Sequence, residues 1–172
     1  MNVTLNEAEI KLANYLALQR HSVNRQSGTT DRQMGLNDKL FIDLNGVGGE
    51  LAVCKALGVY PDLEIGPRSG GFDLVTRRGY RADVKTTAVQ KGRLLAFLDK
   101  KPEDSDIYIL VVGEIPNYEI VGWCWAEELL KPENIIDLGH GRTYALSQDR
   151  LRDFGSKMSN RYTEVGTVKI RS

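Results

Sequence analysis

Cysteine is scarce in this chain: among its 172 residues only Cys54 and Cys124 are cysteines. Two cysteines cannot build the disulfide framework of a small secreted domain or a cysteine-based zinc site, so we expect both to be packed in the core. Histidine is equally scarce, and His21 and His140 lie far apart in polar surroundings. We expect both histidines on the surface, which argues against metal ligation or a catalytic triad built on histidine.

Long apolar runs are also missing. The longest runs from Ile107 to Val112, far short of the roughly 20 residues that a membrane-spanning helix needs. The N-terminus lacks the basic and apolar regions of a secretory signal. Because 41% of the residues are hydrophobic and 27% are charged, the composition is that of an ordinary globular domain. We expect a cytoplasmic protein with a single domain over residues 1–172.

Phosphate-binding glycine loops are absent as well. The run Gly46-Val47-Gly48-Gly49 lacks the third spaced glycine of a dinucleotide-binding fingerprint, and the sequence contains no Gly-Lys-Ser/Thr phosphate loop. These absences argue against a nucleotide-binding Rossmann or P-loop protein.

Charge is distributed unevenly, although the formal net charge is zero. Residues 66–101 carry nine Lys or Arg against three Asp, whereas residues 102–137 carry one Lys against nine acids. Basic segments that converge in space can bind phosphate backbones whatever the total charge, because only the local field matters within a Debye length of about 10 Å. Charge alone fits solvated surfaces equally well.

Helical spacing of apolar residues predicts two helices in the first third of the chain. The first covers residues 5–22, with Asn2 or Thr4 as its N-cap, and a polar surface loop follows over 23–37. The second begins between residues 37 and 46 and ends at Leu57, where Gly58 supplies a left-handed C-cap.

The middle of the chain is rich in β-branched and aromatic residues, which predicts strands. Residues 107–112 show no alternation, as in a central strand covered on both faces. Residues 94–98 fit either a short strand or a helical turn. We expect one mixed α/β domain with strands over 72–76, 80–86, 107–112, 119–125 and 163–170, and short helices over about 125–130 and 148–154.

Glu50 is the first unusual residue. On a helical projection it falls inside the apolar arc that contains Val47, Leu51 and Cys54, so its carboxylate points toward the core. An isolated buried carboxylate costs on the order of several kcal/mol unless it is paired, protonated or bound to a metal. Helix geometry alone fits an internal salt bridge to an arginine and a functional role equally well.

The segment from Asp73 to Asp83 predicts a β-hairpin, and its turn decides which side chains meet. A two-residue turn at Arg78-Gly79 would force Arg78 toward positive φ, which is unfavourable for a residue with a Cβ atom. A three-residue turn that ends at Gly79 needs positive φ only at the glycine. We therefore predict the three-residue turn, which places Asp73 directly opposite Asp83.

In this register the carboxylates of Asp73 and Asp83 face each other. Lys85 lies next to them, because it shares a strand face with Asp83. Phe72 opposes Val84, and we expect it to pack into the core. Like charges directly opposite destabilise a sheet, so a divalent cation between them would explain the arrangement. Two Asp oxygens, the Val84 carbonyl and water suit Mg²⁺, which prefers oxygen ligands. The alternative is two solvated acids at a strand end, neutralised by Lys85 and Arg81.

The ordered set of Glu50 on a helix, Asp73, and then Asp83-Val84-Lys85 on the next strand resembles the PD-(D/E)XK nuclease superfamily. The proline that names the motif is absent, because Phe72 precedes Asp73. The resemblance covers about residues 46–112. It implies a restriction-endonuclease-like α-β-β-β-α-β core around a mixed sheet, with an N-terminal helix and loop over 1–45 and a C-terminal strand and helix extension over 113–172.

The resemblance implies Mg²⁺-dependent hydrolysis of phosphodiester bonds, with Mn²⁺ as a substitute and DNA as the expected substrate, as in small phage-encoded or repair-type nucleases. It makes Asp73, Asp83 and the Val84 carbonyl metal ligands, Glu50 a direct or water-mediated ligand, and Lys85 the group that handles the nucleophile. Candidate contacts to the nucleic acid backbone or to the metal shell are Gln90, Lys91, Arg93, Arg25 and Arg32.

Two other functions stay open: a non-catalytic nucleic-acid-binding module, and a protein-interaction domain that retains a nuclease fold. Trp123, Trp125 and Tyr118 could stack on bases, but their place in an apolar strand and helix start favours core packing. The intact set of four charged site residues argues against both alternatives. The sequence leaves open whether the chain forms a homodimer.

Overall fold

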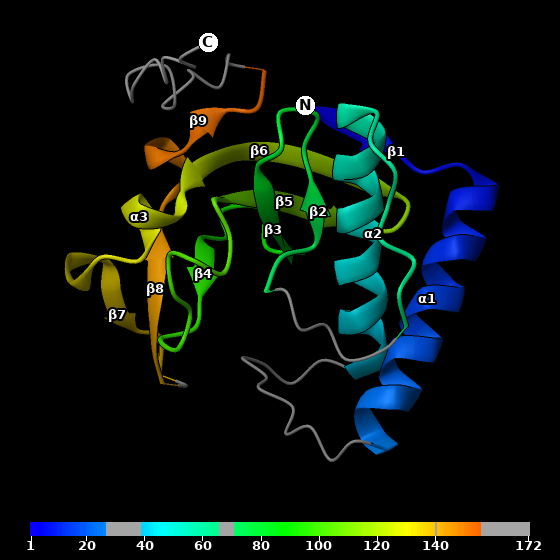
Figure 1. The fold of residues 1–172 in the computed structure, drawn as a ribbon, viewed down its shortest axis with the longest axis horizontal. Helices are drawn as coiled ribbons and strands as arrows, with labels where there is room; N and C mark the ends of the chain where they lie inside the picture. The colour runs from blue at the N-terminus through cyan, green and yellow to red at the C-terminus, as the bar shows by residue number, and fades with distance from the viewer. Residues whose placement is uncertain (27–38, 66–70, 140, 156–172) are drawn as a thin grey trace, which may run out of the picture.

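Two β-sheets organise the part of the chain that the computed structural model describes, which comprises residues 1–26, 39–65, 71–139 and 141–155 (Figure 1). The larger sheet has the strand order β1-β6-β5-β3-β2, with β9 paired to β6. Its strands are β1 (Asn2–Thr4), β2 (Leu74–Val75), β3 (Arg81–Thr87), β5 (Ile107–Glu114), β6 (Asn117–Trp125) and β9 (Arg152–Asp153). The smaller sheet contains β4 (Leu94–Ala96), β8 (Arg142–Leu146) and β7 (Ile135–Asp137) in that order.

The two long helices are α1 (Glu7–Gln26) and α2 (Lys39–Leu57), and the short α3 (Ala126–Leu129) follows β6. Two single 3₁₀ turns complete the description, η1 (Pro132–Asn134) and η2 (Gln148–Arg150). No helix in the described residues is both long enough and apolar enough to cross a membrane. The predicted mixed α/β class and both long helices are confirmed, and Gly58 follows α2 with a φ of 61°.

Strand β5 lies at the centre of the larger sheet. It pairs in parallel with β3 and antiparallel with β6, and its residues from Ile107 to Val112 are at most 2% exposed. Side chains on one of its faces pack against α1 and α2, and those on the other pack against β4, β8 and α3. Figure 1 shows the helices side by side at one side of the larger sheet and the smaller sheet at the other. The predicted central strand is confirmed.

Glycine lets α2 approach the larger sheet closely. A Cβ atom at Gly48 would lie 2.0 Å from the hydroxyl of Tyr118. That hydroxyl is buried and donates a hydrogen bond to Asn45 Oδ1 at 2.9 Å, so the ring cannot move away cheaply. By contrast, a Cβ atom at Gly46 would meet nothing within 4 Å.

We expect Gly48→Ala to lower the free energy of unfolding by about 2 kcal/mol, because overpacking a rigid core site typically costs about 1–3 kcal/mol. Gly46→Ala on the same helix is the matched control, and we expect it to raise the free energy of unfolding by up to about 1 kcal/mol through helix propensity. Urea unfolding of both variants measures the difference. Equal stability of the two variants would contradict the close helix–sheet contact.

The predicted three-residue turn is confirmed. Leu74 pairs with Ala82, which leaves residues 77–79 as the turn. Gly79 has a φ of 83°, and no non-glycine residue in the described ranges has positive φ. The predicted core position of Phe72 is wrong: its side chain is half-buried, and the Arg81 guanidinium lies 6.0 Å from its ring centre. The ring lies at the margin of the sheet because β2 is only two residues long.

An ion pair fixes the start of β3 beside β5. The Asp106 carboxylate accepts hydrogen bonds from the Arg81 backbone N–H at 2.8 Å and from Arg81 Nη2 at 3.0 Å. These hydrogen bonds outweigh partial burial and hold the pKa of Asp106 below its ordinary value. A carboxyl with a lowered pKa in the folded state stabilises the fold above its ordinary pKa, and this stabilisation is lost as the pH falls through the folded-state pKa.

We therefore expect Asp106→Asn to lower the free energy of unfolding by about 1 kcal/mol at pH 7, a figure that allows for solvent screening of a partly exposed pair. The difference from the wild type should shrink as the pH falls below about 3.8, the ordinary pKa of the side chain. Urea unfolding across this range measures it, with the exposed Glu133→Gln as a control. A difference that does not change with pH would show that the charge of Asp106 is not involved.

The N-terminal predictions need two corrections. Asn2 and Thr4 do not cap α1, because residues 2–4 pair with β6 as β1. The cap is Asn6, whose Oδ1 accepts from the Glu9 N–H while Glu9 Oε2 accepts from the Asn6 N–H, a reciprocal capping box. The predicted loop over 23–37 begins too early, because α1 continues to Gln26 without a glycine or proline to stop it.

Three further differences lie in the second half of the chain. The predicted helix over 148–154 is wrong, because the 3₁₀ turn η2 is followed by β9, which pairs with Gly122 and Trp123 of β6. The crossover from β3 to β5 contains β4 and turns rather than the helix that the α-β-β-β-α-β order requires. The ambiguous segment 94–98 contains β4, and the predicted strand over 163–170 lies outside the described residues.

Candidate functional site

An open sheet edge brings the predicted site residues together. The pairing of β2 with β3 goes no further than Leu74 and Ala82. In the described part of the chain, residues 83–87 of β3 are therefore paired only with β5. Asp83 and Lys85 lie on the face of β3 that is opposite to Ala82 and Val84. Because the edge is open, side chains from both faces can meet around it.

Lys85 lies within range of the charges of all three predicted acids. The charges of Asp83, Asp73 and Glu50 all act on its ammonium group, and these residues come from β3, the segment before β2, and α2. Burial alone would lower the pKa of Lys85, but these negative charges outweigh it and raise the pKa above its ordinary value. The ammonium is therefore charged at neutral pH. The three acids predicted from sequence thus lie within electrostatic range of Lys85.

Asp83 is the most deeply buried acid of the group, with a side chain that is 3% exposed. Two ammonium groups balance it: Lys85 Nζ lies 2.5 Å from Oδ1 and Lys100 Nζ lies 2.9 Å from Oδ2. Lys100 also donates to the Gly71 carbonyl at 2.9 Å, which ties the segment before β2 to the turn after β4.

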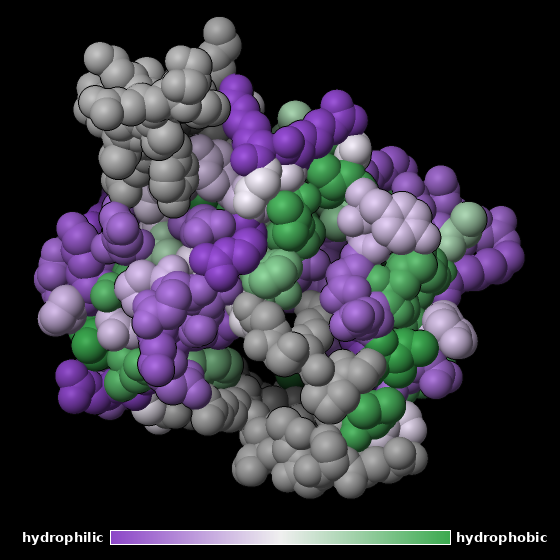
Figure 2. Space-filling model, in the orientation of Figure 1, coloured by the Kyte–Doolittle hydropathy of each residue, from purple (hydrophilic) through white to green (hydrophobic). Residues whose placement is uncertain are grey.

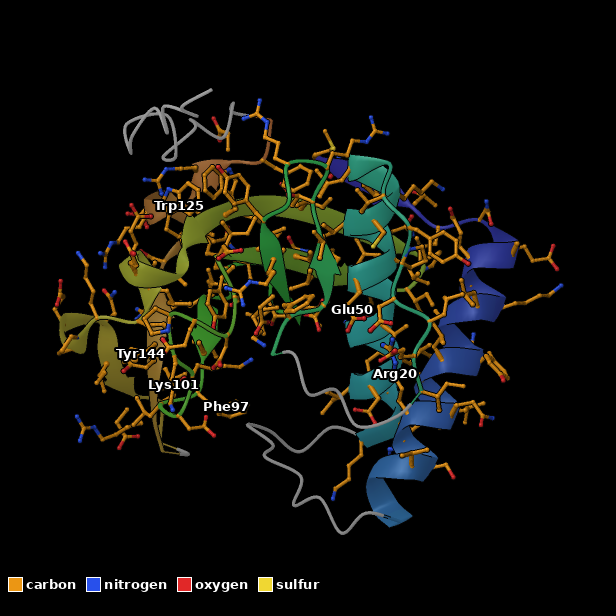
Figure 3. The ribbon with its side chains drawn as sticks, in the orientation of Figure 1. Arg20, Glu50, Phe97, Lys101, Trp125 and Tyr144 are labelled. Carbon is orange, nitrogen blue, oxygen red and sulfur yellow. The ribbon has the colours of Figure 1, made fainter. Side chains whose placement is uncertain are left out.

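Glu50 projects from α2 toward α1, where Arg20 Nη1 lies 3.1 Å from its Oε2 (Figure 3). Arg20 also donates to the backbone carbonyls of Asp62 and Glu64. The internal salt bridge to an arginine is thus real, and Glu50 serves it while also acting on Lys85. Gly49 lets α2 lie close to β3 at this position, because a Cβ atom at residue 49 would lie 2.0 Å from the Thr86 hydroxyl oxygen.

Asp73 lies just before β2, beside the open edge of β3. Its Oδ2 accepts a hydrogen bond from the Val84 N–H at 2.7 Å, and its own N–H donates to the Ala82 carbonyl at 2.8 Å. The N–H and C=O groups of one strand residue leave the strand on the same side, so the Val84 carbonyl also points to the edge where Asp73 lies. We call Arg20, Glu50, Asp73, Asp83, Lys85 and Lys100 the charge cluster.

The charge cluster contains the oxygen donors that Mg²⁺ prefers, namely Asp83 on β3, Asp73 in the segment before β2, and the Val84 backbone carbonyl. Among the described residues, however, no three acidic, histidine or cysteine side chains are gathered closely enough to hold a metal ion. Glu50 is therefore not gathered with the two aspartates as a third direct carboxylate ligand. A cation here would be held by the carboxylates of Asp73 and Asp83, the Val84 carbonyl and water. In the structure the cluster is balanced by its own three cations.

A cleft of about 540 Å³ opens beside Lys85. Its floor is the end of β3, one wall is the first part of α2, and the other wall is formed by the smaller sheet with the turn before β4. The residues that line it include Phe41, Asn45, Lys85, Arg93 and Phe97. Figure 2 shows this side of the molecule, with hydrophilic residues over much of the smaller sheet and more hydrophobic surface on the helical side.

The predicted substrate contacts are only partly brought together. Arg93 is exposed and lines the cleft. Gln90 and Lys91 are exposed in the same turn, and the Gln90 carbonyl accepts a hydrogen bond from Gln148 at 2.8 Å. Arg32 lies outside the described residues, as does the side chain of Arg25.

Sequence reasoning missed Lys100 and did not identify Arg20. Lys100 lies in an Asp-Lys-Lys run that reads as a solvated turn, and only the fold brings it to Asp83. For Arg20 the signal was the expected arginine partner of Glu50, without its position. The expected surface position of His21 is wrong, because its ring packs between the helices, 2.7 Å from Asp43 Oδ2.

The cysteines and the aromatic residues of β6 are buried. Cys54 and Cys124 are both buried, as expected, and burial raises the pKa of the Cys124 thiol to about 12. Trp123, Trp125 and Tyr118 are core residues, at most 7% exposed, so they are not a base-stacking surface. His140 lies outside the described residues.

Residues 2–132 match the model of a family described as a family of unknown function, DUF5843. The chain belongs to this family. The matched range contains every residue of the charge cluster and ends before β7, so that β7 and β8 of the smaller sheet lie beyond it. No curated protein and no solved structure matches the chain.

Proposed function

We propose that the chain is a divalent-cation-dependent nuclease of the PD-(D/E)XK type that hydrolyses phosphodiester bonds in nucleic acid, with DNA as the expected substrate. Its core would be a restriction-endonuclease-like core without the helix between β3 and β5, where the described residues form β4 and turns. The observation that carries the proposal is the position of Lys85. Its ammonium is acted on by carboxylates from three separate elements and lines a cleft. Groups with shifted pKa values that gather in a cleft are typical of catalytic sites.

In this proposal Asp73, Asp83 and the Val84 carbonyl hold Mg²⁺ or Mn²⁺. The bound cation would supply charge neutralisation at the phosphate and a more acidic water. Lys85 Nζ lies 2.5 Å from Asp83 Oδ1, next to the proposed cation, where its ammonium would stabilise negative charge that builds on the phosphate. Lys100 orients Asp83 from the other side, and Arg20 fixes Glu50.

One observation favours a second candidate, the non-catalytic nucleic-acid-binding or protein-interaction module. Each acid of the charge cluster already has a protein partner: Asp83 has two ammonium groups, Glu50 has Arg20, and Asp73 has the Val84 N–H. A cluster that is neutral by itself can be a purely structural element. A test of hydrolysis separates the two candidates.

The test is to incubate the chain with labelled linear, circular and branched DNA in the presence of Mg²⁺, Mn²⁺ or EDTA. The proposal expects cleavage with either cation and none with EDTA, and the pattern of fragments distinguishes exonuclease from endonuclease action. If none of the substrates is cleaved with either cation, the nuclease proposal is wrong and the module replaces it.

A further inference from the structure

The walls of the cleft are apolar and carry aromatic rings on opposite sides. Phe41 lies on the α2 wall and is 38% exposed. Phe97 follows β4 on the other wall, where it is half-buried and projects beyond the end of the strand (Figure 3). Ile42 and Leu95 extend the two walls. An aromatic ring left partly open to solvent in a cleft offers a surface on which a planar group can stack.

The polar part of the cleft is cationic. Lys85 lies at its floor and Arg93 at its rim, and no aspartate or glutamate occurs among the described residues that line it. Around it, residues 84–101 contain five Lys or Arg against a single Asp. Lys85 is already ion-paired with Asp83, but a purely apolar ligand would leave the charge of Arg93 at the rim unused. The surface fits an anion that also carries flat apolar groups.

We infer that the cleft binds unpaired nucleotides, so that the substrate is single-stranded nucleic acid or an unpaired end rather than intact duplex. This inference rests on the proposed nuclease function, because Lys85 belongs to both. Nucleobases stack on aromatic rings with little regard to sequence, while phosphates pair with Lys and Arg. The volume of about 540 Å³ lies within the range of pockets that enclose small molecules.

Duplex fits this cleft poorly for a geometric reason. In a duplex the base faces are stacked on one another, so a base can reach a pocket only after it is unpaired and turned out of the helix. That step costs free energy which a single strand does not have to supply. A strand whose bases are already free can place a base between the two walls while its phosphates lie along Arg93 and Lys85.

The test measures binding in EDTA, where the proposed hydrolysis is stopped. Fluorescence anisotropy follows the titration of the chain into a labelled 12-nucleotide strand, the same sequence as a blunt duplex, and the same strand with abasic sites, as DNA and as RNA. We expect the single strand to bind about 10-fold or more tightly than the duplex, and the abasic strand to lose about 10-fold, because it keeps the phosphates but lacks the stacking bases.

Variants locate the effect. Phe97→Leu keeps an apolar side chain but removes the ring, and we expect about a 10-fold loss for the single strand and no change for the duplex; Phe97→Tyr should retain binding. Tyr60→Ala removes a ring that is 80% exposed and does not line the cleft, so it is the control and should bind as the wild type does. The measurement does not depend on cleavage, so a chain that prefers single strands but cleaves nothing would overturn only the nuclease proposal.

Equal or tighter binding of duplex, equal binding of the abasic strand, or no binding of either nucleic acid would overturn the inference, whatever the cleavage assay shows. A loss in Phe97→Leu that is the same for both substrates, or a loss of the same size in Tyr60→Ala, would also overturn it, because the cleft would then have no special relation to unpaired bases.

Discussion

Lys85→Met is expected to lower the rate of phosphodiester hydrolysis about 10²–10³-fold, the typical effect of removing one group that stabilises charge in a transition state. Methionine keeps the unbranched apolar stem but removes the ammonium that Asp83, Asp73 and Glu50 hold in its charged form. The fold should persist, because Lys100 remains to balance Asp83 at 2.9 Å. Cleavage of labelled DNA in Mg²⁺, with thermal unfolding of the same preparation, measures both properties.

Lys101→Met is the matched control, because it removes the same charge from an exposed side chain in the turn that also carries Lys100. We expect its cleavage rate to stay within about a factor of two of the wild type, since isolated surface charges contribute little. If Lys85→Met and Lys101→Met were to cleave equally fast, Lys85 would have no part in the chemistry.

Asp83→Asn is expected to lower the free energy of unfolding by about 3 kcal/mol, which for a chain of this size means a melting temperature lower by roughly 6–12 °C. The carboxylate is buried and balances both Lys85 and Lys100, whose side chains are 31% and 21% exposed. Asparagine removes the counter-charge of Lys100 and one of the three carboxylates that act on Lys85. Removing one partner of a buried ion pair costs about 3–5 kcal/mol, and partial exposure of the lysines favours the lower end.

Two further variants test that explanation. Asp73→Asn should cost less, because its amide oxygen can still accept the hydrogen bond from the Val84 N–H. The double variant Asp83→Asn with Lys100→Met should recover part of the loss, since it removes one uncompensated ammonium. Calorimetry of the four proteins measures these differences. An Asp83→Asn variant as stable as the wild type would show that the two ion pairs contribute nothing to the fold.

Several parts of the site could be predicted because they depend on local rules. The positive φ required of Gly79 selected the three-residue turn, and the two-residue period of a strand placed Asp83 and Lys85 on one face. The helical projection pointed Glu50 inward and implied a cationic partner. Each of these inferences uses residues within a few positions of one another, where geometry leaves few choices.

Other parts depend on contacts that no local pattern encodes. Lys100 reaches Asp83 only because the turn after β4 folds back toward the segment before β2. Strand β9 forms in place of a predicted helix because β6 offers it an edge to pair with. The predicted repulsion between carboxylates was overestimated for the same reason, since Arg20 of α1 and Lys100 after β4 reach Glu50 and Asp83 only in the folded chain.

The nuclease proposal requires that Asp73 and Asp83 hold a divalent cation. Calorimetric titration of Mn²⁺ into the wild type and into Asp73→Asn, a variant expected to keep the fold, tests it most directly. We expect one Mn²⁺ site per chain in the wild type and binding at least 10-fold weaker in the variant. Absence of Mn²⁺ binding at millimolar concentration in the wild type, or equal binding in the variant, would contradict the proposed cation site and leave the cluster as a set of structural ion pairs.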